Sequence, residues 1–425
     1  MIWLHLSNIS QFARLSGIPR TEYEIFTYFN KLRLDGDLIK FCTYDAKSGF
    51  KELDENQINK ILDFYANPEE KNINVNDYNS KRHLRTRKNF FVKIKVKCKK
   101  MLNSILKRIH LINIYFNRIN HPFESGDLLI SSGLNIKSRD FFELEKIKSN
   151  IQLKITVLCY DIIPEKHPEL VKKQANILFK KHLKRLARIA DLFCCNSEYV
   201  EKELYNYLQH NNHKKTPIKI IPLGCQFVNK YANIANSPKL KELTEHPYLM
   251  FVSTIEIRKN HQVLYRAYLE LIEKKVSNLP KILFVGRKGW LVNDFLNQLN
   301  NDIRVKDKIL ILEDVSDNEL IYLYKNCMFT LFPSIVEGYG LPVAESLALG
   351  KYCLASNRSS LPEVGKDFID YIDPYDSEAW ARQIEFLLSH PEYVSNKEDL
   401  IRLNYRPNSW LETGQSLFQI IKDLE

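Results

Sequence analysis

The sequence predicts an α/β protein of two domains, each built around a parallel sheet. Its 425 residues exceed the size that one compact core usually organises. Short apolar runs alternate with stretches of helical spacing, which is the pattern of parallel strands joined by helices. A polar stretch rich in Asn and Lys, residues 231–247, separates two such series and predicts a linker between the domains.

The first series predicts an N-terminal domain over residues 1–230. Its expected strands cover residues 2–6, 37–44, 127–131, 153–158, 192–195 and 218–221, and a long helical stretch covers residues 169–190. Residues 66–89 are rich in Asn, Lys and Glu. They are expected to form a mobile surface excursion, as part of a basic insertion of about residues 66–115.

The second series predicts a C-terminal domain over residues 248–405. Its expected strands cover residues 248–253, 281–285, 309–312, 329–332, 352–355 and 368–372, with helices at 262–275 and 318–325. Residues 406–425 are expected to form an amphipathic helix that crosses back to the N-terminal domain. Ligands of parallel sheets bind outside the carboxyl ends of the strands, so the two domains should face one another across a cleft.

The cysteine and hydrophobic patterns argue against several other classes of protein. None of the eight cysteines has Cys-x-x-Cys spacing, so buried thiols in a reducing cytoplasm are expected rather than zinc ligands. No apolar run approaches the roughly 20 residues that a membrane-spanning helix needs. The N-terminus is expected to be a first strand and not a signal peptide.

The positive charge is concentrated in one stretch. Residues 81–110 contain twelve Lys or Arg and no Asp or Glu, whereas the rest of the chain has 50 basic and 51 acidic residues. Apolar and basic residues alternate there and then follow helical spacing, which suits an anionic membrane surface. A solvated basic face is the alternative. The residues expected to contact the membrane are Lys93, Lys95, Lys97, Lys99 and Lys100. No nucleic-acid-binding motif accompanies the charge, so nucleic acid is not an expected partner.

The segment after the strand expected at residues 329–332 has residue types that bind phosphate and sugar hydroxyls. Gly338 and Gly340 allow close approach of the backbone, and a helix beginning near Pro342 directs its positive end at the same place. Glu337 and Glu345 place one carboxylate at each end of this turn. The alternative is a loop charge at Glu337 and a carboxylate at Glu345 that stabilises the helix dipole.

This segment, Glu-Gly-Tyr-Gly-Leu-Pro-Val-Ala-Glu over residues 337–345, resembles the signature of family 4 retaining glycosyltransferases. Those enzymes have the GT-B fold, in which two Rossmann-like parallel-sheet domains face one another across a cleft. Segments 253–260, 284–287 and 314–320 match in the same order, and in the N-terminal half so do 17–20, 160–169, 195–198 and 221–224. This set of segments resembles the mannosyltransferase-like branch that acts in bacterial surface polysaccharide assembly.

The resemblance implies a division of roles in a donor site. Glu337 would contact the transferred sugar, and Glu345 would accept hydrogen bonds from the ribose. Arg258 and Lys259 would neutralise the diphosphate as it departs, unless they are only a solvated pair in a turn. The other expected donor-binding residues are Gly17, Gly286, Val315, Gly338, Tyr339, Gly340 and Leu341.

Two positions depart from the family pattern. Thr254 stands where many relatives have Arg, so Arg258 would supply the second positive charge. Tyr160 stands in place of a histidine that is thought to contact the transferred sugar. Asp161 is then the candidate for orienting or deprotonating the acceptor hydroxyl, and the alternative is that it caps the turn before Pro164.

The resemblance thus implies a retaining hexosyltransferase without a metal or other cofactor. The expected donor is GDP-mannose or a UDP-hexose, and the expected acceptor is a glycan, free or linked to polyprenyl diphosphate. The expected location is the cytoplasm, at the inner face of the cytoplasmic membrane. A catalytically silent nucleotide- or glycan-binding protein, a sugar-nucleotide epimerase and a phosphorylase are the alternatives.

Overall fold

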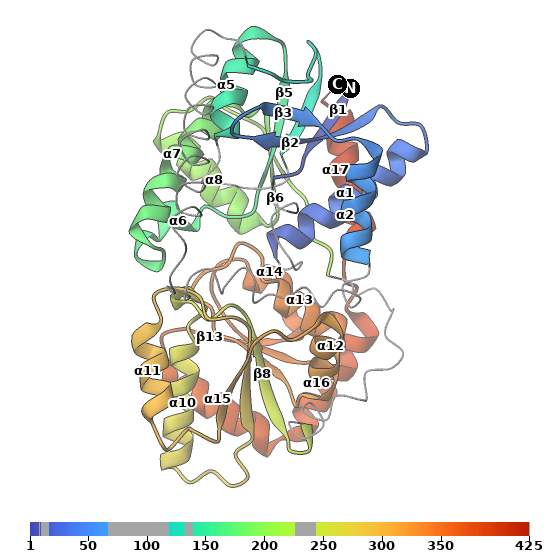
Figure 1. Ribbon diagram of the computed structural model, residues 1–425. Helices are drawn as coiled ribbons and strands as arrows, with labels where there is room; N and C mark the ends of the chain where they lie inside the picture. Colours follow the sequence, from blue (N-terminus) through green and yellow to red (C-terminus); the bar gives the residue numbers. More distant parts are fainter. Residues whose placement is uncertain (8, 10–16, 67–118, 132–138, 226–243, 425) are drawn as a thin grey trace, which may run out of the picture. The chain divides into compact units, whose positions relative to one another are not determined.

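The computed structural model describes residues 1–7, 9, 17–66, 119–131, 139–225 and 244–424 (Figure 1). Contacts divide the chain into two compact units. Unit 1 comprises residues 1–158, 181–193 and 213–217, and unit 2 comprises residues 159–180, 194–212 and 218–425. The surface excursion predicted at residues 66–89 falls almost wholly outside the described residues.

The strands of the N-terminal half form a seven-stranded sheet with the order β3-β2-β1-β4-β5-β6-β7. These strands are β1 (Ile2–His5), β2 (Ile39–Asp45), β3 (Gly49–Glu52), β4 (Leu128–Ser131), β5 (Lys154–Cys159), β6 (Leu192–Cys195) and β7 (Ile218–Ile220). β1 pairs in parallel with β2 and β4, and β4 pairs in parallel with β5. The parallel sheet predicted from the sequence is confirmed.

The edge strand β3 is antiparallel to β2 and is not predicted by the sequence. A tight turn joins the two strands: the Asp45 carboxylate accepts a hydrogen bond from the backbone N–H of Lys47 (2.9 Å), and Gly49 adopts a φ of 78°. An Asx-type turn followed by a residue with positive φ closes a short antiparallel hairpin.

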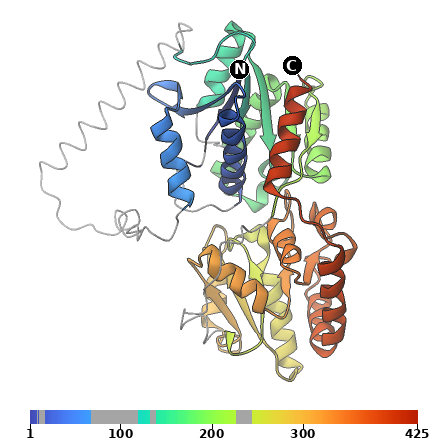
Figure 2. The same cartoon turned by 90° about the vertical axis from the view of Figure 1, so that its right-hand side faces the viewer.

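Helices connect most of these strands. They are α1 (Ile18–Leu34), α2 (Glu55–Ala66), α5 (Asp140–Asn150), α6 (Ile163–Lys166), α7 (Lys173–Ile189) and α8 (Glu198–His210). α1 and α2 lie side by side (Figure 2), and the rings of Tyr23 and Tyr65 are 5.1 Å apart. Among the residues that the structure describes, no helix is long and apolar enough to cross a membrane.

A six-stranded sheet in unit 2 has the order β10-β9-β8-β11-β12-β13. Its strands are β8 (Tyr248–Val252), β9 (Lys281–Val285), β10 (Ile309–Leu312), β11 (Thr330–Phe332), β12 (Cys353–Ser356) and β13 (Asp370–Ile372). Every pairing is parallel. The helices are α10 (His261–Glu273), α11 (Asn293–Asn301), α12 (Asp317–Asn326), α13 (Leu341–Ala348), α14 (Leu361–Gly365), α15 (Ser377–Ser389), α16 (Pro391–Asn404) and α17 (Trp410–Lys422).

Both faces of this sheet are covered, which explains why its strands are apolar runs rather than alternating ones. Along β8, Phe251 packs in one core cluster with Val263 of α10. Met250 packs in another with Leu323 of α12. α10 and α12 accordingly lie on opposite sides of β8 in Figure 1.

Candidate donor site

The central group of the candidate site is the Glu337 carboxylate, which lies in the loop between β11 and α13. The side chain of Glu337 is buried, and it accepts hydrogen bonds from Arg258 (2.7 Å) and Lys259 (2.5 Å). The loop is held through its backbone as well. The Glu337 N–H donates to the Ser359 hydroxyl (2.9 Å), and the Ser360 hydroxyl donates to the Glu337 carbonyl (3.1 Å).

Arg258 and Lys259 belong to a single 3-10 turn (Ile257–Lys259) that follows β8. The turn ends at Asn260, which adopts a left-handed conformation with φ 60°. The Asn260 side chain donates to the carbonyl of Pro374 (2.6 Å) and fixes that end of the turn. The Lys259 ammonium also lies 5.1 Å from the centre of the Phe332 ring. These contacts hold two cations beside one carboxylate.

The cations decide the charge state of Glu337. Burial alone would raise the pKa of the carboxyl group, but the charges and hydrogen bonds of Arg258 and Lys259 outweigh it and lower the pKa to about 2. Burial lowers the pKa of Lys259, and Glu337 opposes that shift. Because Lys259 donates to an ionised carboxylate, we assign it the ammonium form.

Asp161 follows β5 and lies near this cluster within unit 2. Its carboxylate accepts a hydrogen bond from the backbone N–H of Ile163 (3.0 Å), so it does cap the turn before Pro164. Burial raises the pKa of Asp161, while Arg258 pulls it down. A carboxylate with a raised pKa is suited to accept a proton, and capping and proton acceptance are compatible.

Gly338 brings the segment that carries Asp161 against the glycine turn. A Cβ atom on Gly338 would stand 2.1 Å from the carbonyl oxygen of Tyr160, so only glycine fits there. The Ser197 hydroxyl, at the start of α8, donates to the Gly338 carbonyl (2.7 Å). The residue preceding Asp161 and the turn following Glu337 are therefore in direct contact.

The second carboxylate, Glu345, lies in α13 after a glycine that begins the helix. Gly340 adopts a φ of 104°, and Leu341 is the first residue of α13. Glu345 Oε2 accepts a hydrogen bond from the hydroxyl of Tyr324 in α12 (3.2 Å). The neighbouring Tyr339 hydroxyl donates to the carbonyl of Leu223 (3.2 Å).

Four adjacent strands place the predicted residues at one edge of the six-stranded sheet. Val315 follows β10, Gly286 follows β9, Arg258 follows β8 and Glu337 follows β11. Gly286 has no room for a side chain, because a Cβ atom would stand 1.9 Å from the Ser253 carbonyl oxygen. The carboxyl edge of a parallel sheet is where such folds bind ligands.

For two groups of predicted residues, the place relative to this arrangement stays a prediction. Gly17 belongs to unit 1, where it precedes α1 with a φ of 56° and open space around its Cα. The residues expected to contact a membrane lie outside the described residues: Lys93, Lys95, Lys97, Lys99 and Lys100.

Sequence reasoning missed Glu256, Tyr324 and Ser197. Glu256 forms a 2.6 Å ion pair with the Arg258 Nε, and Tyr324 and Ser197 donate to Glu345 and Gly338. Glu256 lies inside the segment 253–260 that was singled out, and its position two residues before Arg258 was the available signal. Ser197 likewise lies inside the segment 195–198 that was singled out, whereas Tyr324 reaches the site through tertiary packing alone.

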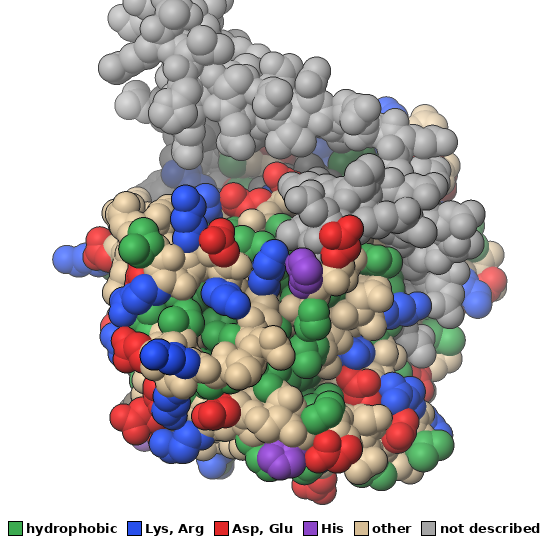
Figure 3. All heavy atoms as spheres, turned by 90° about the horizontal axis from the view of Figure 1, so that it is seen from below, with side chains coloured by type: hydrophobic (Ala, Val, Ile, Leu, Met, Phe, Trp, Pro, Cys, Tyr) green, Lys and Arg blue, Asp and Glu red, His purple; other side chains and the backbone are tan. Residues whose placement is uncertain are grey.

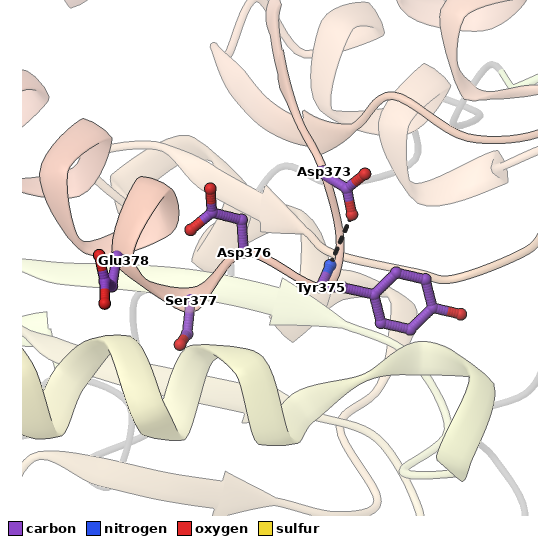
Figure 4. Close-up of a pocket in the computed structure, with 5 residues that line it drawn as sticks. All are labelled: Asp373, Tyr375, Asp376, Ser377 and Glu378. Atoms are coloured by element: carbon purple, nitrogen blue, oxygen red, sulfur yellow. Dashed lines mark hydrogen bonds between the residues drawn. The ribbon is translucent and has the colours of Figure 1, made fainter.

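A depression in unit 2 carries several acidic groups. It is lined by Asp373, Tyr375, Asp376, Ser377 and Glu378, around the start of α15. Figure 4 shows these side chains pointing in different directions, and Asp373 accepts from the N–H of Tyr375 (2.9 Å). Within the described parts of the chain, no cluster of His, Cys, Asp or Glu is arranged to hold a metal ion.

Comparison with known proteins finds a family model that matches part of the chain. Residues 233–402 match the family model "Glycosyl transferases group 1". The serotype-specific mannosyltransferase WbdA of Escherichia coli is 26% identical over 279 residues, covering 62% of this chain and 33% of that protein. The O-antigen chain mannosyltransferase B of Escherichia coli is 36% identical over 143 residues, covering 34% of this chain and 37% of that protein. The chain thus spans about a third of the length of these relatives.

A solved structure supports the architecture. The crystal structure of Anabaena HepE in complex with UDP-glucose matches with a TM-score of 0.61 and 14% identity, and all of each chain is covered. At this identity the likeness concerns the fold. Together with the two parallel sheets, it confirms the predicted GT-B fold of two parallel-sheet α/β domains.

Proposed function

We propose that this chain, whose residues 233–402 are a glycosyl transferases group 1 domain, transfers a hexose from a nucleoside diphosphate sugar to a glycan acceptor. The observation that carries the proposal is the cluster that the buried Glu337 and Lys259 form with the partly buried Arg258 at the carboxyl ends of β8 and β11. Two cations held in place suit a diphosphate, and an ionised carboxylate beside them suits sugar hydroxyls.

The donor would occupy the carboxyl edge of the six-stranded sheet. Glu345, supported by Tyr324, accepts hydrogen bonds from the ribose hydroxyls, and backbone groups at Gly286 and Val315 line the base pocket. The N–H groups of residues 338–341 and the start of α13 face the diphosphate and sugar, because glycine permits close approach and a helix N-terminus favours anions.

The proposed reaction retains the configuration of the sugar and needs no metal. The bond between the anomeric carbon and the diphosphate oxygen breaks, and the acceptor oxygen bonds to the same face of that carbon. The acceptor proton passes to the departing diphosphate oxygen, with Asp161 orienting the hydroxyl. Arg258 and Lys259 stabilise the charge that develops on the leaving group, which is the role a divalent cation has in other enzymes.

Mannose is the proposed sugar, with GDP-mannose ahead of a UDP-hexose as donor. The support is that two relatives are mannosyltransferases by name, one serotype-specific and one acting on the O-antigen chain. A glycan of a bacterial surface polysaccharide, free or linked to polyprenyl diphosphate, is the proposed acceptor.

We place the enzyme at the inner face of the cytoplasmic membrane, and the described residues add support. Helix α7 carries six Lys or Arg and no Asp or Glu. Its buried side includes Phe179 and Leu183. On its outer side Lys181 and Lys184 are exposed, and neither makes an ion pair with any described residue. By contrast, the face shown in Figure 3 has basic and acidic side chains intermixed. A one-signed helix face of this kind suits an anionic bilayer.

A donor screen tests the proposal. Wild-type protein should be stabilised against thermal unfolding by GDP-mannose or by a UDP-hexose and should turn over the preferred donor with a glycan acceptor. Glu337→Gln should keep the fold and lose turnover. Stabilisation by a nucleotide without any turnover would favour a silent binding protein instead, and conversion of the donor to its epimer would favour an epimerase.

A further inference from the structure

Glu256 is a buried carboxylate that the proposed reaction does not use. It precedes the 3-10 turn that carries Arg258 and Lys259, and only 2% of its surface is exposed. One carboxylate oxygen lies 2.6 Å from the Nε of Arg258, and no described residue offers the other oxygen, Oε2, a hydrogen bond. Such a carboxylate costs folding free energy, and groups of this kind are often placed for function.

Arg258 uses its nitrogen atoms for two different carboxylates. Nε contacts Glu256, while NH1 donates to Glu337 (2.7 Å) and to the Val336 carbonyl (3.2 Å). Arginine presents its donors in a rigid planar fork, so fixing Nε also fixes the direction of the terminal nitrogens. The two carboxylates therefore have separable effects on a single guanidinium group.

A diphosphate that arrives at this cluster changes only one of these two contacts. If Glu337 turns to the sugar, Arg258 exchanges that carboxylate for phosphate oxygens and loses one of the two contacts that now hold NH1. The Nε contact lies on the other side of the guanidinium and can persist throughout. Without the Nε contact, the bound diphosphate would have to order the long Arg258 side chain, which has many rotamers, again.

We infer that Glu256 is a positioning residue that holds Arg258 through Nε, so that the terminal nitrogens stay directed at the diphosphate when Glu337 engages the sugar. This inference rests on the proposed function for its catalytic consequence, but the anchoring itself is a property of the unliganded chain. Charged groups around Glu256 are Arg258, Lys259, Glu337 and Asp161.

Two variants separate anchoring from charge. Glu256→Gln and Glu256→Met both remove the negative charge at nearly equal side-chain volume, but only Gln keeps an oxygen that can accept from Nε. A difference between them therefore reports the polar contact of the oxygen with Nε and not the charge. Glu398, another buried carboxylate in an ion pair (2.9 Å to Lys351), supplies the matched control through the same two substitutions.

The first measurement needs no substrate. Phenylglyoxal modification of Arg258, followed by mass spectrometry of its peptide, should proceed at similar rates in wild type and Glu256→Gln. It should be about tenfold faster in Glu256→Met, as expected when a contact of this class is lost. The Glu398 variants should leave the rate unchanged. Equal rates in the two Glu256 variants would overturn the inference.

The second measurement concerns the donor. The kcat/KM for the donor should be about tenfold lower in Glu256→Met than in Glu256→Gln, mostly through KM. In an Arg258→Ala background the ratio of kcat/KM between the two Glu256 variants should fall to near one, because residue 256 then has no guanidinium group to contact. A ratio that persists there would show that Glu256 does not act through Arg258. If wild-type protein turned over no donor, the proposed function would fail while the labelling result still decided the anchoring.

Discussion

The Lys259 ammonium lies 2.5 Å from the Glu337 carboxylate, and both residues are more than 90% buried. Lys259 follows β8 and Glu337 follows β11, so this ion pair joins the carboxyl ends of two adjacent parallel strands. Breaking a buried pair by removing one partner leaves an uncompensated charge. The pair therefore couples the stability of unit 2 to the charge state of the candidate site.

The coupling predicts an acid dependence of stability. The pKa of Glu337 is lowered to about 2, so its stabilising effect is present above the ordinary carboxyl pKa and is lost as pH falls toward 2. Between pH 7 and pH 3 the loss should be roughly 2 kcal/mol, at about 1.4 kcal/mol per pKa unit. Urea unfolding of wild type and Glu337→Gln should show their stability difference shrinking by that amount. A difference independent of pH would contradict the assigned ion pair.

Removing the Tyr324 hydroxyl should weaken donor binding without slowing the chemical step. Tyr324 donates to Glu345 Oε2 (3.2 Å), so Tyr324→Phe leaves the ribose-binding carboxylate less well oriented. The expected effect is a rise in donor KM of about threefold to tenfold, the usual size of one hydrogen bond, with kcat unchanged. Tyr352→Phe is the control, because the Tyr352 hydroxyl donates a hydrogen bond to Asp370 (2.6 Å). An equal rise in KM in both variants would count against the specific role.

Gly338→Ala should lower activity through a steric clash and not through backbone strain. The new Cβ would stand 2.1 Å from the Tyr160 carbonyl and would drive the glycine turn away from the segment that carries Asp161. We expect kcat/KM to fall by at least about tenfold, because small displacements in a site cost that much or more. Gly126→Ala adds a methyl group in open space at φ 91° and should cost about 1 kcal/mol of stability while activity is kept. Steady-state kinetics and thermal unfolding of both variants measure the difference.

Asp161→Asn should change activity and stability in opposite directions. Burial raises the pKa of Asp161, so its ionisation at neutral pH opposes folding, and the amide removes that cost while it can still accept from the Ile163 N–H. The melting temperature should therefore rise slightly at pH 7, and the difference should vanish below pH 4. Because Asp161 is partly exposed, the gain should be small. If the ionised Asp161 orients the acceptor hydroxyl, the acid limb of the kcat profile should disappear in the variant. An unchanged pH profile would leave only the capping role.

The positions of the strands and the motif residues were predictable because local sequence patterns indicate both. The run at β8 is apolar at every position, since α10 and α12 cover its two faces, and this made it recognisable. Glu337 and Glu345 were recognisable through the glycines between them. β3 was not, because it depends on the turn at Asp45 and Gly49.

The supporting residues could not be predicted in the same way. Tyr324 is 21 residues from Glu345 along the chain, and Ser197 is 141 residues from Gly338. Their contacts arise from helix packing and loop approach, which no spacing rule encodes. Glu256 is close to Arg258 in sequence, but whether its carboxylate meets Nε depends on the 3-10 geometry of the turn.

The basic face of α7 should contribute to membrane binding. Lys181 and Lys184 are exposed on a helix without acidic residues, and each lysine near an anionic surface adds about 1 kcal/mol. Lys181→Gln combined with Lys184→Gln should therefore weaken binding to vesicles containing anionic lipid by roughly 30-fold. Cosedimentation at several salt concentrations measures this, and neutral vesicles should bind neither form.

The matched control for that pair is Lys306→Gln combined with Lys325→Gln, which removes two exposed lysines from unit 2. Both double variants lose the same net charge. A general electrostatic attraction would thus weaken equally in the two, whereas docking through α7 should weaken only when its own lysines are changed. Equal binding by the two double variants would show that α7 is an ordinary solvated helix.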